Sequence, residues 1–226
     1  MIGPDSFRRV LRTALPWQAN GFAVLLLAVA LPALLSFDVL ARWVEGFGLP
    51  TIASWLGVLG ASVFVGATWT ISRAQQAGHT SSWLGVAALL WSVELGLRVA
   101  SAFGWFDSSG SDTARAVLAG AGGLTLSMGM LALVPPSNFR SVRVQWRTSR
   151  ALFAGQLGVF VLLPLVGWML DRPLADWVGA REQLSGWIRS LLWIAFAAPH
   201  LYLFLALRGT RESFTRRESI SDILLR

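Results

Sequence analysis

The sequence predicts an all-α integral membrane protein with six transmembrane helices and with both chain termini in the cytoplasm. Three observations lead to this fold class. The 226 residues are 54% hydrophobic and only 14% charged, and the mean hydropathy is +0.58, which does not fit a soluble domain. Six apolar stretches approach or exceed the roughly 20 residues that cross the hydrocarbon core of a bilayer. Finally, the arginines gather in alternate loops between these stretches.

The six predicted spans cover residues 17–37, 51–72, 82–105, 114–135, 151–170 and 186–207. Residues 1–16 precede them as a cytoplasmic interfacial helix, because apolar side chains between Phe7 and Leu15 recur at helical spacing opposite arginines. A helix that docks a regulator or a partner protein is the alternative. Residues 208–226 follow the last span as a cytoplasmic tail.

The positions of the arginines predict the orientation. All nineteen basic residues are arginine, and short cytoplasmic loops are the loops enriched in basic residues. Thirteen arginines fall on one side of the spans: Arg8, Arg9, Arg12, Arg73, Arg140, Arg143, Arg147, Arg150, Arg208, Arg211, Arg216, Arg217 and Arg226. The opposite side carries Arg42, Arg115, Arg172 and Arg181 among acidic residues. Arginine without lysine is typical of a GC-rich bacterial genome, so the expected location is a bacterial inner (cytoplasmic) membrane.

Two segments of the chain resemble each other. Pro32, Asp38 and the residues LARWV (40–44) are matched by Pro164, Asp171 and LADWV (174–178). This similarity suggests that the bundle is built of three two-helix hairpins. The alternative is that two unrelated amphipathic segments lie outside the membrane and share a composition.

Small residues at four-residue spacing occur in the second and fourth spans. Such residues let helix backbones approach closely in lipid, so they predict that these two spans form the packed interior. A permeation path lined by glycine is the alternative. The predicted packing positions are Gly57, Ala61, Gly66, Ala119, Gly123 and Ser127.

The third span carries an acid and a base in an otherwise apolar run. Glu94 and Arg98 are four residues apart, in the order that favours an ion pair within a helix. A charge at this depth costs on the order of 2–3 kcal/mol, so the pair should face protein or water rather than lipid. Arg189, near the outer end of the sixth span, is the expected third member of this network.

His200 follows Pro199 within the sixth span and is a candidate ligand or proton carrier. Trp91 and Trp193 lie deeper than the other tryptophans, so a bound lipid or pigment near these three residues is a hypothesis, although the sequence predicts no cofactor. The chain has no cysteine. It also lacks metal-ligand spacing, a phosphate-binding loop and a nucleophile–base pair. The sequence therefore predicts no metal and argues against an enzyme without excluding one.

Seven arginines are predicted to contact anionic lipid headgroups or a partner on the cytoplasmic side: Arg8, Arg9, Arg12, Arg140, Arg143, Arg147 and Arg150. Because the basic segments are tethered to membrane helices, we expect no nucleic-acid partner. The favoured function is a non-catalytic membrane subunit or scaffold of a larger membrane protein complex, which binds partner helices and lipid or another apolar ligand. The alternative is a small transporter, channel or permease subunit with a polar path through Glu94, Arg98 and His200.

Overall fold

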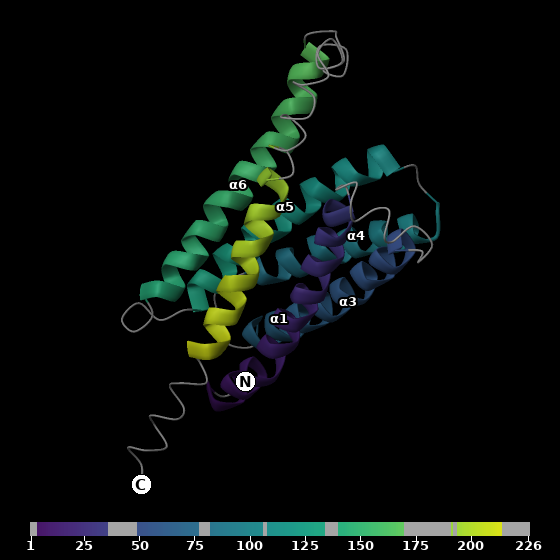
Figure 1. The fold of residues 1–226 in the computed structure, drawn as a ribbon. Helices are drawn as coiled ribbons and strands as arrows, with labels where there is room; N and C mark the ends of the chain where they lie inside the picture. Colours follow the sequence, from purple (N-terminus) through teal and green to yellow (C-terminus); the bar gives the residue numbers. More distant parts are fainter. Residues whose placement is uncertain are drawn as a thin grey trace.

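The structure, a computed structural model, describes residues 4–35, 49–76, 82–105, 108–133, 140–169, 191 and 194–213. Within these ranges the chain is helical except for Ser82, which precedes α4, and the short turn that follows α4 (Figure 1). The helices are α1 (Pro4–Leu35), α3 (Leu49–Gln76), α4 (Trp83–Ala102), α5 (Ser108–Leu133), α6 (Arg140–Met169) and a last helix over residues 194–213. The predicted all-α class is therefore confirmed for the described residues.

Four of these helices are long and apolar enough to cross a membrane: Phe7–Leu31 in α1, Thr51–Gln75 in α3, Trp83–Ala102 in α4 and Thr113–Leu133 in α5. The last three coincide closely with the predicted spans 51–72, 82–105 and 114–135. Residues 151–169 of the fifth predicted span and 194–207 of the sixth are helical, but among the described residues neither helix is one of these four, so the fifth and sixth spans stay predictions. The same holds for the repeat, since Asp38, Asp171 and the two five-residue segments are not among the described residues.

The turn after α4 is encoded by a glycine. Gly104 has a φ of 73°, a conformation that residues with a Cβ rarely adopt. Its N–H donates to the carbonyl of Ser101 at 3.0 Å, and the N–H of Trp105 donates to the carbonyl of Ala100 at 2.9 Å. This pair of bonds is the Schellman motif, which satisfies the last carbonyl groups of a helix. The turn leaves Trp105 exposed at the end of the bundle.

α1 and α3 approach so closely that their backbones touch through two glycines. A Cβ on Gly60 would lie 2.5 Å from the backbone nitrogen of Leu25 and 2.7 Å from the carbonyl oxygen of Gly21. A Cβ on Gly21 would lie 2.7 Å from the backbone nitrogen of Phe64. Close backbone packing of this kind holds helices together where lipid provides no hydrophobic driving force. Only glycine fits at these two positions, and neither was among the predicted packing residues.

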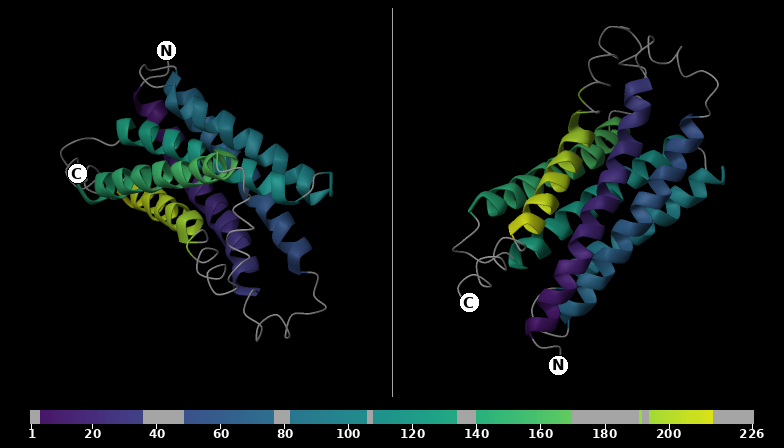
Figure 2. Two further views of the ribbon diagram at one scale, coloured as in Figure 1. Left: turned by 90° about the horizontal axis from the view of Figure 1, so that it is seen from above. Right: turned by 60° about the horizontal axis from the view of Figure 1, so that its bottom comes forward.

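Each described helix packs antiparallel to the helix that precedes it in the chain (Figures 1 and 2). The contacts along each pair of helices run in opposite directions. Between α1 and α3, Gln18 contacts Thr68 and Gly21 contacts Gly60; between α3 and α4, Trp69 contacts Ser92 and Trp55 contacts Phe103. Between α4 and α5, Leu84 contacts Gly129 and Trp91 contacts Gly122; between α5 and α6, Gly120 contacts Leu157 and Gly123 contacts Phe153. Between α6 and the last helix, Trp146 contacts Thr210 and Phe160 contacts Phe196.

This alternation gives the bundle two chemically different ends. One end, which we call the basic end, collects the start of α1, the end of α3, the start of α6 and the end of the last helix. The arginines there are Arg8, Arg9, Arg12, Arg73, Arg140, Arg143, Arg147, Arg150, Arg208 and Arg211. The opposite end carries an outer aromatic cluster, formed by the exposed rings of Trp55, Phe103 and Trp105. The ring centroid of Phe103 lies 5.4 Å from that of Trp55 and 5.5 Å from that of Trp105.

The N-terminal region differs from the sequence-based expectation. The interfacial helix and the first span, predicted as residues 1–16 and 17–37, form the single helix α1. The physical reason is tertiary packing. Leu11 and Leu15 are buried, and the apolar stripe continues in register through Ala19 and Phe22, so one unbroken face packs into the bundle.

The basic segment before the fifth predicted span also differs from the expected loop. Residues 140–150 are helical and form the first three turns of α6. Trp146, expected near a membrane surface, is fully buried and donates its indole N–H to the hydroxyl of Thr210 at 2.7 Å. The hydroxyl of Thr210 in turn donates to the carbonyl of Ala206 at 2.8 Å. This buried contact with the last helix stabilises residues 140–150 as a helix, although their composition alone predicts a loop.

We expect Gly60→Ala to destabilise the protein and Gly66→Ala to leave its stability unchanged or raise it. A Cβ at Gly60 meets backbone atoms that cannot move aside, and such overpacking typically costs about 1–3 kcal/mol. A Cβ at Gly66 meets nothing within 4 Å among the described residues, and alanine favours a helix over glycine by about 1 kcal/mol. Thermal unfolding of both variants in detergent measures the difference. Equal unfolding midpoints would show that α1 and α3 do not touch through Gly60.

Candidate functional site

Aromatic rings from five helices meet around His200 and Trp91 in the interior of the bundle. The imidazole of His200 stacks on Phe22 of α1, with centroids 6.0 Å apart and an interplanar angle of 10°. Phe153 of α6 and Phe196 of the last helix lie 5.5 Å and 4.6 Å from the same ring. Trp91 of α4 meets the imidazole edge-on at 6.4 Å. We call these residues, together with Phe64 of α3, the central aromatic cluster.

The sixth helix, α5, provides glycines that make room for this cluster. Phe64 lies 5.1 Å from Phe22 and 5.1 Å from Trp91, which completes the cluster on the α3 side. A Cβ on Gly122 would lie 2.7 Å from Nε1 of Trp91, and a Cβ on Gly123 would collide with the ring of Phe153. The two glycines therefore allow two large rings to pack directly against the α5 backbone.

The imidazole of His200 is anchored within its own helix. Nδ1 lies 2.7 Å from the carbonyl oxygen of Phe196. Because a carbonyl can only accept a hydrogen bond, Nδ1 is the nitrogen that carries the proton in this contact. The indole Nε1 of Trp91 has no hydrogen-bond partner among the described residues. The structure thus brings together two of the residues proposed as a ligand or proton site, whereas Trp193 lies outside the described part.

Glu94 lies one helical turn from Trp91 and is the most deeply buried acid that the structure describes. Its side chain is 1% exposed, and Arg98 is 9% exposed. Nη2 of Arg98 donates to Oε1 of Glu94 at 2.5 Å, and its Nε donates to the same oxygen at 3.1 Å. The geometry is that of a charge-assisted fork, which is among the strongest polar contacts in proteins. The two residues predicted to pair within the third span are therefore in contact.

A second arginine approaches the same carboxylate from the neighbouring helix. Nε of Arg115, on α5, lies 3.5 Å from Oε1 of Glu94. On the α3 side, a Cβ on Gly57 would lie 2.8 Å from Nη1 of Arg98 and 3.6 Å from the Cβ of Ala28. Gly57 thus leaves room for the guanidinium of Arg98. We call Glu94, Arg98 and Arg115 the buried ion network.

Arg115 was not among the predicted members of this network. It lies in the second residue of the fourth predicted span, at the outer end. In the structure, Trp91 and Leu84 of α4 lie level with Gly122 and Gly129 of α5, so the backbone of Arg115 lies about one helical turn outward from the level of Glu94 and its long side chain spans the difference. Arg189, the predicted third partner, lies outside the described residues, so its role stays a prediction.

The predicted packing residues lie in different environments. Ala61, Ala119 and Ser127 are buried, and Gly57 and Gly123 lie against side chains of other helices. Gly66 differs, because it is exposed and a Cβ there would meet nothing within 4 Å among the described residues. Gly66 therefore packs against no other helix among the described residues of this chain. Gly66 is exposed because of the rotation of α3: the face with Gly57, Gly60 and Phe64 points into the bundle, and the face with Ser62 and Gly66 points outward.

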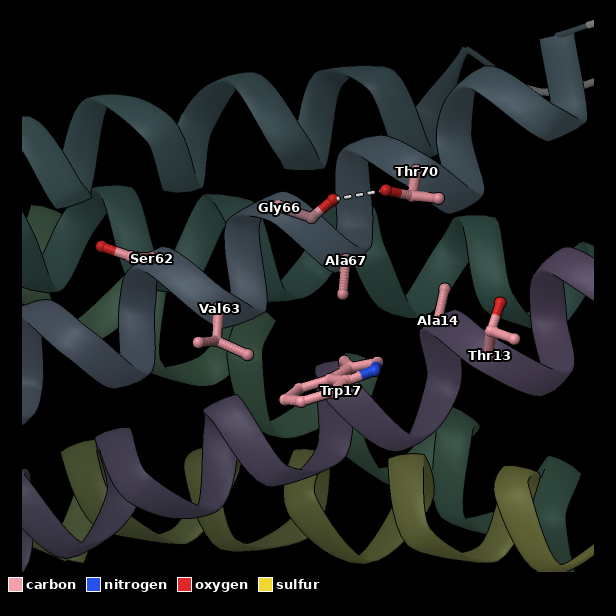
Figure 3. Close-up of a pocket in the computed structure, with 8 residues that line it drawn as sticks. All are labelled: Thr13, Ala14, Trp17, Ser62, Val63, Gly66, Ala67 and Thr70. Atoms are coloured by element: carbon pink, nitrogen blue, oxygen red, sulfur yellow. Dashed lines mark hydrogen bonds between the residues drawn. The ribbon is translucent and has the colours of Figure 1, made fainter.

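The face of α3 that contains Gly66 borders a groove shared with α1 (Figure 3). Val63 and Ala67 of α3 point toward Trp17 and Ala14 of α1 across this space. The groove has a volume of about 430 Å³ and is lined by Thr13, Ala14, Trp17, Ser62, Val63, Gly66, Ala67 and Thr70. It opens to the outside of the bundle, since Trp17 is 64% exposed.

The arginines predicted to contact headgroups or a partner have varied surroundings. Arg8, Arg9, Arg12, Arg147 and Arg150 are exposed, and Arg143 is partly buried. Arg140 begins α6. Their shared feature is their position at the basic end. Among the described residues, no three histidine or carboxylate side chains come together, so this part of the chain holds no set of metal ligands.

We expect Glu94→Gln to lower the free energy of unfolding by on the order of 3 kcal/mol, because it removes the carboxylate that the buried guanidinium of Arg98 contacts. The matched control is Glu212→Gln. Glu212 pairs with Arg208 at 3.1 Å, also four residues apart, but both side chains are 65% exposed, so the loss should stay below about 1 kcal/mol. Thermal unfolding in detergent compares the two variants. Equal effects would mean that Glu94 is hydrated rather than buried.

Comparisons of this chain with protein-family models, with curated proteins and with solved structures gave no match. A function can therefore be proposed from three observations on the molecule itself: the central aromatic cluster, the buried ion network beside it, and the contrast between the two ends of the bundle.

Proposed function

We propose that this chain is a multi-pass membrane protein whose six helices all cross the bilayer, with both termini on the cytoplasmic side of a bacterial inner membrane. The four helices that are long and apolar enough to span support the membrane location. The basic end supports the orientation, because cytoplasmic loops are enriched in arginine. The outer aromatic cluster of Trp55, Phe103 and Trp105 supports it from the other side, since exposed aromatic rings favour the membrane–water interface.

Within the membrane, we propose that the chain acts as a non-catalytic subunit or scaffold of a larger membrane protein complex. The observation that carries this proposal is the filled interior around its charged groups. Glu94 is held between two guanidinium groups, and His200 is packed by aromatic rings. Groups held in this way stabilise one arrangement of helices. Contacts with other proteins or with lipid then fall to the outer faces of the bundle.

A transporter or permease subunit is the second candidate, and one observation favours it. Ser127, Ser149 and Gln156 are buried in α5 and α6, and their side-chain polar atoms have no partner among the described residues. Buried polar groups of this kind can line a path for a polar solute in a membrane protein. Together with Glu94, Arg98 and His200, they would form that path.

A comparison of Glu94→Gln with His200→Phe separates the two functions. A subunit carrying either substitution should still copurify with the same partner proteins in mild detergent, as identified by mass spectrometry. His200→Phe should also keep most of its thermal stability, because phenylalanine preserves the ring contacts with Phe22 and Phe196.

The transporter function predicts a different result, because both substitutions remove a titratable group from the path. Solute uptake or proton flux in reconstituted vesicles should then fall by about tenfold or more for both variants. If the unmodified protein copurifies with no other chain and both variants lose such flux, the subunit proposal is wrong.

A further inference from the structure

The groove between α1 and α3 presents an apolar surface in spite of its hydroxyl groups. The hydroxyl of Ser62 donates to the carbonyl of Val58 at 2.7 Å, and that of Thr70 donates to the carbonyl of Gly66 at 2.8 Å. The hydroxyl of Thr13 lies 3.1 Å from the carbonyl of Val10. Each donor is thus used within its own helix. Most of the surface that faces the groove is therefore hydrocarbon, which suits a hydrocarbon ligand.

Both walls of the groove end in an arginine. On α1, Arg9, Thr13 and Trp17 recur every four residues and therefore share one face of the helix. On α3, Gly66 and Thr70 are followed by Arg73 on the same side. Because the two helices are antiparallel, both arginines lie at the basic end of the groove. Arg73 is about 4.5 Å along the helix axis beyond Thr70.

The positions of the two arginine side chains are compatible with binding an anion there. Arg9 and Arg73 are both exposed. The guanidinium carbon of Arg73 lies 5.8 Å from the ring centroid of Trp69, which keeps the charge beside the helix. An apolar groove with positive charge at one end matches an amphiphile that has a hydrocarbon chain and an anionic head.

We propose that the α1/α3 groove is a binding site for an anionic phospholipid of the cytoplasmic leaflet. One acyl chain lies along the groove between Trp17 and Gly66, and the phosphate lies between Arg9 and Arg73. The volume of about 430 Å³ is in the usual range for a small-ligand site. A partner helix fits less well, since the large exposed ring of Trp17 lies in the groove beside Val63 and Ala67 and would have to move aside for a second backbone.

This inference rests on the proposed membrane location but not on the proposed subunit role. If no partner protein copurifies while lipid is retained as described below, the subunit role fails and the lipid site stands. If partner proteins copurify while the groove variants retain as much lipid as the unmodified protein, the lipid site fails and the subunit role stands.

The test uses the full-length protein in detergent, with phosphatidylglycerol and phosphatidylcholine of identical acyl chains as the probes. Native mass spectrometry measures how much of each lipid stays bound. Gly66→Leu should block the groove and reduce the retention of both lipids. Gly96→Leu is the matched control, because Gly96 is also an exposed helical glycine whose added Cβ would meet nothing within 4 Å among the described residues.

The charge part of the site is tested with the double variant Arg9→Gln/Arg73→Gln. It should lower phosphatidylglycerol affinity by roughly tenfold or more and leave phosphatidylcholine almost unchanged. Arg208→Gln/Arg211→Gln removes the same charge from the basic end at two exposed arginines of the last helix, which does not line the groove, so it should bind both lipids normally. The proposal is overturned if both double variants lose phosphatidylglycerol equally, if Gly66→Leu and Gly96→Leu retain the same lipid, or if Gly66→Leu changes the number of protein copies per particle instead.

Discussion

The packing of large rings around Trp91 and His200 is the contact on which the rest of this bundle depends. In a bilayer, the hydrophobic effect does not drive helices together, so their association relies on close van der Waals packing. Five helices contribute a ring to the central aromatic cluster, and the glycines of α5 let two of those rings reach the backbone. One cluster thereby fixes the relative positions of all six described helices.

The buried ion network is tolerated because the same packing brings its members together. A carboxylate and two guanidinium groups would each be costly in hydrocarbon alone. Glu94 and Arg98 lie on one helix and neutralise each other, and the second arginine, Arg115, comes from the neighbouring helix and is 22% exposed. Gly57 adds the space that the Arg98 side chain needs. Charge and packing therefore favour the same arrangement of α3, α4 and α5.

Much of the candidate site could be read from the sequence, but its partners could not. Glu94 and Arg98 are visible as a pair because their spacing matches one helical turn. Arg115 was counted as an outer-loop residue, since nothing in a single sequence tells which neighbouring helix faces Glu94. Likewise, Gly57 and Gly66 both belong to the pattern of small residues at four-residue spacing, so the sequence does not distinguish their roles. Only the rotation of α3 in the bundle turns the first toward Arg98 and the second toward the groove.

The all-helical class and the presence of helices long and apolar enough to cross a membrane could be predicted from the sequence, because hydropathy and length are local properties of the chain. The gathering of arginines at one end could also be predicted from the sequence, because successive loops between antiparallel helices lie at alternate ends of the bundle. Tertiary structure decided what local patterns cannot express. The apolar face from Leu11 to Phe22 joins two predicted segments into α1, and the buried bond from Trp146 to Thr210 makes the expected basic loop part of α6. The close contact between Gly21 and Gly60 also depends on which faces of α1 and α3 pack together, because a glycine is required only where the backbone of another helix comes close.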